Sequence, residues 1–152
     1  MGRRGFSLIE MFVVFVVVGV IVMIGAPRLR DAFEKTNVRS ARIAVATSAA
    51  IARAAAVQRG CRAALHFAYG TSSGMWVTAC RLATPNSVDT IGSVRNLSNE
   101  YKVTLTATLD SVRYDPRGLS VETADALVRV TGNSQGNSDS LIIKSYTGKV
   151  VR

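Results

Sequence analysis

The stretch that decides the fold stands at residues 1–27, MGRRGFSLIEMFVVFVVVGVIVMIGAP. From Phe6 to Ala26 it contains 21 residues, of which only Ser7 and Glu10 are conventionally polar. A bilayer core of about 30 Å needs roughly 20 helical residues, so this run is long enough for one transmembrane span. A carboxylate within such a run is costly and usually marks a functional site. Glu10 therefore requires an explanation.

The residues around the run indicate how the segment is used. Arg3 and Arg4 precede it, and positive charge at this place predicts a cytoplasmic N-terminus with the rest of the chain outside the inner membrane. A cleavable secretory signal would need small residues before the cleavage site, but Met23 or Ile24 would occupy the critical position. A plain membrane anchor is a second alternative, and it leaves Glu10 unexplained.

The segment Gly5-Phe6-Ser7-Leu8-Ile9-Glu10, between a short basic leader and an apolar helix, resembles the prepilin motif of type IV pilins and type II secretion pseudopilins. In that family a membrane peptidase cuts after the glycine and methylates the new N-terminus. The resemblance implies a leader at residues 1–5, cleavage between Gly5 and Phe6, N-methylation of Phe6, and the prepilin peptidase as a partner. It also implies that Glu10 pairs with the α-amino group of Phe6, in its own or a neighbouring subunit, because a buried carboxylate is tolerable beside a cation.

We predict a transmembrane segment at 6–26 and an amphipathic helix at 27–59. Pro27 is expected to kink the helix, because proline removes an intrahelical hydrogen bond. Residues 28–59 contain no Gly or Pro and are rich in the helix formers Ala and Arg, and Gly60 is a typical stop. The face predicted to pack on a sheet consists of Ile43, Thr47, Ala50, Ala54 and Val57, which recur at three- and four-residue steps.

Residues 60–152 show short alternating segments and turns, which predict an antiparallel β-rich head, with 27–152 as one globular domain. Strands 61–67 and 75–82 are expected to form a hairpin that places Phe67 opposite Gly74. Cys61 then faces Cys80 within reach of a disulfide, which we predict in preference to two free buried thiols. We interpret 82–99 as a loop. The remaining predicted strands are 102–109, 111–114 paired with 119–122, 127–131, 140–146 and 149–152.

The head also resembles a branch of the pilin superfamily. Arg59-Gly60-Cys61, Gly74-Met75-Trp76-Val77, the 112–118 hairpin and the ending Gly148-Lys149-Val150-Val151-Arg152 are similar to motifs of the GspH/FimT-type minor pseudopilins. Lys149 is a departure, because these proteins usually have arginine there. The fold implied is α+β and type IV pilin-like: a long kinked N-terminal helix, half transmembrane and half amphipathic, packed on the antiparallel head.

The resemblance implies a structural subunit at the tip of a type II secretion pseudopilus or a type IV pilus, anchored in the inner membrane with its head in the periplasm. Its partners would be other pilins, contacted through the N-terminal helix. The formal charge of +9 suggests anionic partners. The alternative is therefore a DNA-binding minor pilin acting in natural transformation, with Lys144, Lys149 and Arg152 as the candidate DNA-binding residues.

Enzymatic and metal-dependent functions find no support in the sequence. His66 is the only histidine, and the two cysteines form no CxxC motif or Cys/His cluster. No nucleophile elbow or Gly-rich phosphate loop occurs. We therefore expect no catalytic residues, no metal site and no cofactor.

Overall fold

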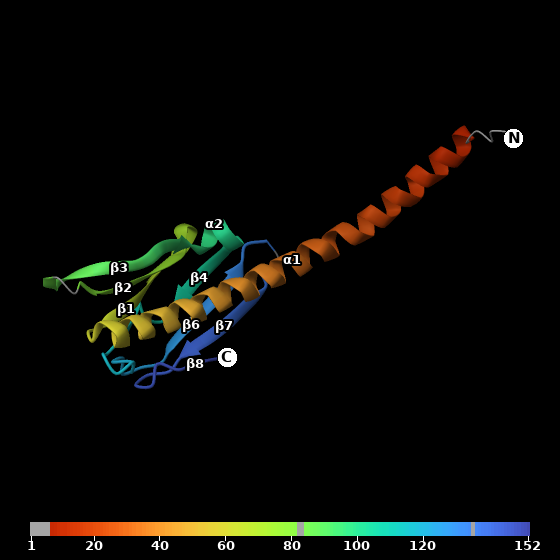
Figure 1. Ribbon diagram of the computed structural model, residues 1–152. Coiled ribbons are helices and arrows are strands. Elements are labelled where there is room, and N and C mark those ends of the chain that lie inside the picture. Colours follow the sequence, from red (N-terminus) through yellow and green to blue (C-terminus); the bar gives the residue numbers. More distant parts are fainter. Residues whose placement is uncertain (1–6, 82–83, 135) are drawn as a thin grey trace, which may run out of the picture. The chain divides into compact units, whose positions relative to one another are not determined.

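The computed structural model describes residues 7–81, 84–134 and 136–152 (Figure 1). The chain divides into two compact units, which meet between Phe33 and Glu34. Its helices and strands are α1 (Leu8–Arg59), β1 (Ala63–Ala68), the 3₁₀ turn η1 (Gly70–Ser72), β2 (Gly74–Arg81), β3 (Thr84–Asn96), α2 (Leu97–Tyr101), β4 (Val103–Ala107), β5 (Ser111–Tyr114), β6 (Ala126–Gly132), β7 (Ser138–Ile143) and β8 (Val150–Val151). The predicted α+β class is confirmed.

The N-terminal unit consists of the first half of α1. Every residue from Ser7 to Ile24 is exposed, and the helix is long and apolar enough to cross a membrane by length and composition. Pro27 lies inside α1, and its role as a kink stays a prediction. Gly5 and Phe6, the predicted cleavage site, lie outside the described residues.

The C-terminal unit contains two four-stranded sheets, in the orders β3-β2-β1-β5 and β4-β6-β7-β8, and every strand pair is antiparallel. In Figure 1 the second half of α1 runs alongside the strands of both sheets. One core joins α1 to the sheets, and it includes Leu65, Val77, Leu105, Tyr114 and Val128. In β1, β4, β5 and β6 alternate residues are buried in this core, as a strand period of two requires.

The face that α1 buries is not the predicted one. Ile43 and Val57 are each 52% exposed, and Thr47, Ala50 and Ala54 are exposed as well. The buried stripe instead consists of Val38, Ala41, Val45, Ala49, Ala52 and Ala56. Because alanine has almost no side chain, this stripe lets the helix backbone approach the sheets closely, and the bulkier face points outward.

Most predicted strands are present with shifted ends, as for 140–146, whose strand ends at Ile143, but two predictions are wrong. Residues 84–96, expected to be a loop, form the 13-residue edge strand β3, which pairs with β2. The predicted strand 119–122 is absent apart from an isolated bridge between Tyr114 and Ser120, and β5 pairs with β1 instead. The intervening turn is present, since the Gly118 N–H donates to the Asp115 carbonyl at 2.9 Å.

The predicted disulfide between Cys61 and Cys80 is confirmed, with Cα atoms 6.2 Å apart. The register used to predict it was wrong by one residue, because Phe67 lies opposite Met75 and Ala68 opposite Gly74. The bridge forms all the same, because Cys61 precedes β1 in a bend rather than lying in the strand. Leu82, the predicted end of the second strand, lies outside the described residues.

Candidate functional site

Glu10, which the prepilin resemblance implies as the filament-assembly residue through its pairing with the α-amino group of Phe6, lies in the first turn of α1. Its backbone N–H donates to the Ser7 carbonyl at 3.0 Å, and its side chain is exposed. Among the described residues none pairs with its carboxylate. An unpaired carboxylate on an apolar helix is unfavourable in a membrane, so the geometry leaves it available for a cation from outside this part of the chain.

A second carboxylate, that of Glu34, attaches α1 to the loop between β6 and β7. It is buried, and it accepts hydrogen bonds from the Ser134 backbone N–H at 3.0 Å and from Asn137 Nδ2 at 3.2 Å. The side chain lies directly over Gly132, where a Cβ atom would clash with it. This contact leaves no signal in the sequence, because its members are about 100 residues apart and no local pattern connects them.

Charged groups also gather around the disulfide at the other end of the buried half of α1. Arg59 Nη1 donates to the Cys80 carbonyl oxygen at 2.7 Å. Asp89 of β3 lies between two guanidinium groups, 3.7 Å from Arg59 Nη1 and 3.1 Å from Arg81 Nη2. These contacts and the bridge attach the end of α1 to strands β2 and β3.

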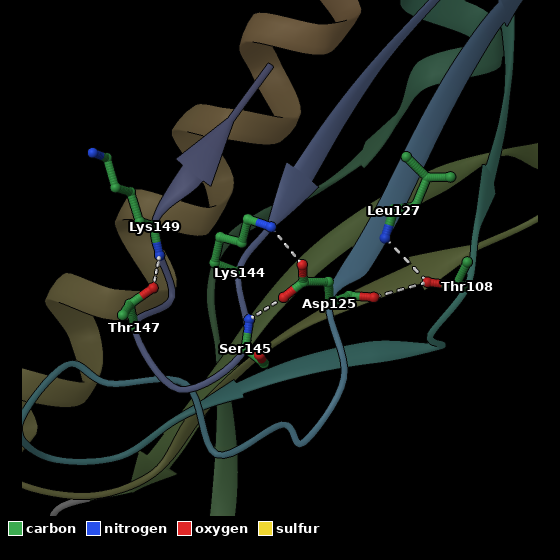
Figure 2. Close-up of polar contacts among 7 residues, drawn as sticks. All are labelled: Thr108, Asp125, Leu127, Lys144, Ser145, Thr147 and Lys149. Atoms are coloured by element: carbon green, nitrogen blue, oxygen red, sulfur yellow. Dashed lines mark hydrogen bonds and ion pairs between the residues drawn. The ribbon is translucent and has the colours of Figure 1, made fainter.

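The residues predicted to bind DNA do not form a free cationic surface. Figure 2 shows the Lys144 ammonium group directed at Asp125, and Nζ lies 2.7 Å from Oδ2. This contact, with the Ser145 backbone N–H at 2.8 Å, lowers the pKa of the Asp125 carboxyl. Arg152 Nε lies 3.9 Å from Asp139, which also pairs with Arg42 at 3.0 Å.

Lys149 is arranged differently from the other two. In Figure 2 its side chain extends away from the Asp125 cluster. Within the described part of the chain its backbone alone is held: the N–H donates to Thr147 Oγ1 at 3.4 Å, and the carbonyl accepts from the Lys144 N–H at 2.9 Å. Two of the three predicted DNA contacts therefore lie beside carboxylates. A protein that tracks phosphates needs several uncommitted cations, so this arrangement gives the DNA alternative no support.

The outward face of α1 borders an apolar hollow of about 470 Å³. Ile43, Ala46 and Ala50 line it from the helix, and Leu141 and Val150 line it from β7 and β8. Arg42 and Arg152 lie at its polar margin. This hollow and the exposed apolar segment Leu8–Ile24 are features that a chain working with protein neighbours would expose.

Residues 41–147 match the family model described as type II transport protein GspH. The chain belongs to the GspH family. That match covers most of the head and most of the buried half of α1, and it leaves the prepilin motif and the ending Gly148–Arg152 outside.

Two crystal forms of the type IV minor pilin FimU from Pseudomonas aeruginosa resemble this GspH-family chain. The first has a TM-score of 0.59 at 13% identity, covering 78% of this chain and 89% of FimU. The second has a TM-score of 0.52 at 14% identity, covering 74% of this chain and 90% of FimU. No curated protein matches the chain in sequence.

The chain is accordingly a member of a type II transport protein family and has the fold of a type IV minor pilin. Neither comparison supports the DNA-uptake alternative. Across the described residues no group of three His, Cys, Asp or Glu side chains lies close enough to hold a metal ion. His66 Nε2 is occupied by a 2.8 Å hydrogen bond with Thr78 Oγ1.

Proposed function

We propose that this chain is anchored in the inner membrane by its N-terminal helix and enters a filament of pilins or pseudopilins, with its head in the periplasm. The observation that carries the proposal is the run Ser7–Ile24, which is exposed throughout, apolar, and interrupted by the single carboxylate of Glu10. Burying such a run, in lipid or against other apolar helices, is strongly favourable. One acidic residue near its start is costly unless a partner supplies a cation.

The processing of the chain follows from the same proposal. The prepilin peptidase cuts between Gly5 and Phe6, and the α-amino group of Phe6 is methylated. Glu10 then pairs with the α-amino group of its own or a neighbouring subunit, which aligns the incoming helix while the apolar surfaces bundle. Pro27 kinks the helix beyond the span. The likeness to a minor pilin supports a minor subunit, which we place at the filament tip.

The experiment expresses the chain in a host with an active prepilin peptidase and the cognate assembly system. Mass spectrometry of the membrane-extracted protein should find N-methylated Phe6 as the first residue. Gly5→Val should leave the leader in place. Glu10→Gln, which keeps the size of the side chain but removes its charge, should be cleaved normally and yet fail to co-purify with the other filament subunits.

The control is Glu100→Gln, which removes an exposed carboxylate from α2 in the head and should co-purify normally. An intact Met1 in such a host would exclude the processing scheme. Normal incorporation of Glu10→Gln would exclude the role of the charge in assembly.

A further inference from the structure

The outer face of the sheet β3-β2-β1-β5 carries a hollow of about 430 Å³. Leu65 and Val77 point into the core, so the strand alternation directs Ala64, His66, Trp76 and Thr78 to the opposite face. The register sets Ala64 opposite Thr78 and His66 opposite Trp76. Two small residues therefore form a floor beside a pair of tall aromatic side chains.

The aromatic wall of the hollow, formed by His66 and Trp76, is held in a fixed arrangement. The rings of His66 and Trp76 are stacked, with centroids 5.2 Å apart and planes inclined by 13°. The hydrogen bond between His66 Nε2 and Thr78 Oγ1, 2.8 Å long, holds the imidazole in place. Burial lowers the pKa of His66, so the wall is uncharged at neutral pH. An indole held in this way offers a flat apolar surface to a ligand.

Cations and an apolar rim complete the hollow. Arg113, which lies opposite Ala64 on β5, is already engaged by Glu122, with Nε 2.9 Å from Oε1. Arg62 lines the same hollow and forms no hydrogen bond or ion pair with any residue that the structure describes. On the β3 side Val88 is 73% exposed. The hollow thus combines an apolar interior with one uncommitted guanidinium group.

We propose that this hollow docks an acidic segment of a partner protein, with one aromatic side chain against Trp76 and a neighbouring carboxylate on Arg62. Its volume is in the range of specific pockets, and a side chain anchored in such a pocket contributes most of the energy of many interfaces. The unit Glu34–Arg152 has 15 Lys and Arg against 8 Asp and Glu, a formal charge of +7. That charge attracts acidic partners over a distance.

A protein segment fits these observations better than a nucleic acid does. Single-stranded nucleic acids bind along grooves where cations follow successive phosphates and several aromatic rings stack on successive bases. This hollow has one stacked pair, and of its two arginines one is committed to Glu122. It accommodates one anchored side chain and one carboxylate.

The test uses the full chain in detergent micelles and needs no filament. Trp76 is the only tryptophan, so its fluorescence reports directly on the hollow. The probe is the capped peptide Gly-Asp-Phe-Asp-Gly, which itself contains no tryptophan. We expect a saturable change in Trp76 emission that weakens with added salt. Gly-Asn-Phe-Asn-Gly and Gly-Asp-Ala-Asp-Gly should each bind about tenfold more weakly, since each lacks one of the two interactions.

Two variants locate the binding site. Ala64→Leu fills the floor from the outer face and should abolish binding, while Arg62→Gln should weaken it about tenfold. The matched controls are Thr106→Leu on the outer face of the other sheet and Arg117→Gln, an exposed cation outside the hollow, and both should bind normally. An intact disulfide and an unchanged circular dichroism spectrum confirm that each variant is folded.

Three results would overturn the proposal: undiminished binding by Ala64→Leu, equal binding of the neutral peptide, or a single-stranded oligonucleotide that binds the hollow more tightly than the acidic peptide. None of them bears on processing or filament entry, because the assay involves neither. Failure here is therefore distinguishable from failure of the proposed function.

Discussion

The carboxylate of Glu34 holds the loop between β6 and β7 through Ser134 and Asn137. Hydrogen bonds to a charged group contribute about 1.5–3 kcal/mol each, less where solvent competes. We expect Glu34→Ala to lower the free energy of unfolding by about 2 kcal/mol, as measured by urea denaturation. Gln58→Ala, at an exposed position of the same helix, should change it by less than about 0.5 kcal/mol.

Gly132 tests the same contact from the other side. A methyl group there would overlap the Glu34 side chain, so Gly132→Ala should destabilise the head by about 1–3 kcal/mol. In the Glu34→Ala background the clash disappears, and the added methyl should then cost almost nothing. Strictly additive effects of the two substitutions on the free energy of unfolding would contradict this arrangement.

Tyr114 carries a buried hydroxyl group that has no hydrogen-bond partner among the described residues. Burial raises its pKa to about 12. In the unfolded chain the Tyr114 phenol ionises near pH 10, whereas in the folded protein it stays neutral up to about pH 12. Its contribution to the free energy of unfolding is therefore fully present below pH 10 and is lost between about pH 10 and 12. Urea unfolding at several pH values should show Tyr114→Phe losing less stability in this window than the wild type.

At neutral pH the same substitution removes a polar group that the fold leaves unsatisfied. Tyr114→Phe should therefore be as stable as the wild type, or about 1 kcal/mol more stable. The corresponding control is Tyr69→Phe, which should lose stability because it removes a hydrogen bond: the Tyr69 hydroxyl donates to the Leu109 carbonyl at 2.7 Å. A clear loss of stability in Tyr114→Phe would mean that its hydroxyl group has a partner.

The second half of α1 has a buried stripe and an adjacent outward face, and stability measurements can show which of the two packs on the sheets. Ala52 is fully buried, whereas Ala54 lies on the outward face. Ala52→Leu should cost about 1–3 kcal/mol through overpacking, and Ala54→Leu should be nearly neutral. If Ala54→Leu instead lowered the melting temperature more than Ala52→Leu, the buried face would be the one predicted from sequence.

The helix shows why its existence could be predicted but not its orientation. Composition and the absence of Gly and Pro from 28 to 59 suffice for a helix. Alanine occurs on both stripes, however, so apolar periodicity favoured the side carrying Ile43 and Val57. The burial of the alanine stripe is decided by how closely the sheets approach, which is a property of tertiary packing.

For related reasons, neither β3 nor the hollow on the outer face of its sheet could be predicted. Pro85, Asn86 and Gly92 are typical loop residues, yet pairing with β2 outweighs these local preferences. His66 and Trp76 are ten residues apart, and a register wrong by one residue does not place them opposite each other. The prediction of the disulfide is correct despite that error, because Cys61 lies in a bend and not in a strand.

The bridge between Cys61 and Cys80 closes a loop with a sequence separation of 19. Its loss should lower the free energy of unfolding by roughly 3 kcal/mol in the Cys61→Ser/Cys80→Ser variant, mainly by relaxing the unfolded chain. Calorimetry with and without reductant should show the same difference for the wild type. Two alkylatable thiols in protein that was never reduced would contradict the bridge.

The unit Glu34–Arg152 has its own core, which suggests that it does not depend on the apolar segment for stability. We expect a fragment of residues 28–152 to fold in water without detergent and to unfold at the same urea concentration as the full chain. Far-UV and near-UV circular dichroism measure both. A fragment that keeps helical signal but lacks fixed aromatic packing would show that the core requires the N-terminal half of α1.

The two ends of the buried half of α1 are attached to the head in different ways. Near Arg59 the attachment is covalent, through Cys61 and Cys80, and near Glu34 it consists of hydrogen bonds. Tension applied to α1 from its N-terminal side would reach the Glu34 contacts first, so the head would yield there by losing the β6–β7 loop. The disulfide would still tether the helix to β2, so that a pulled head would loosen at one end and close again once the tension fell, without losing its strand order.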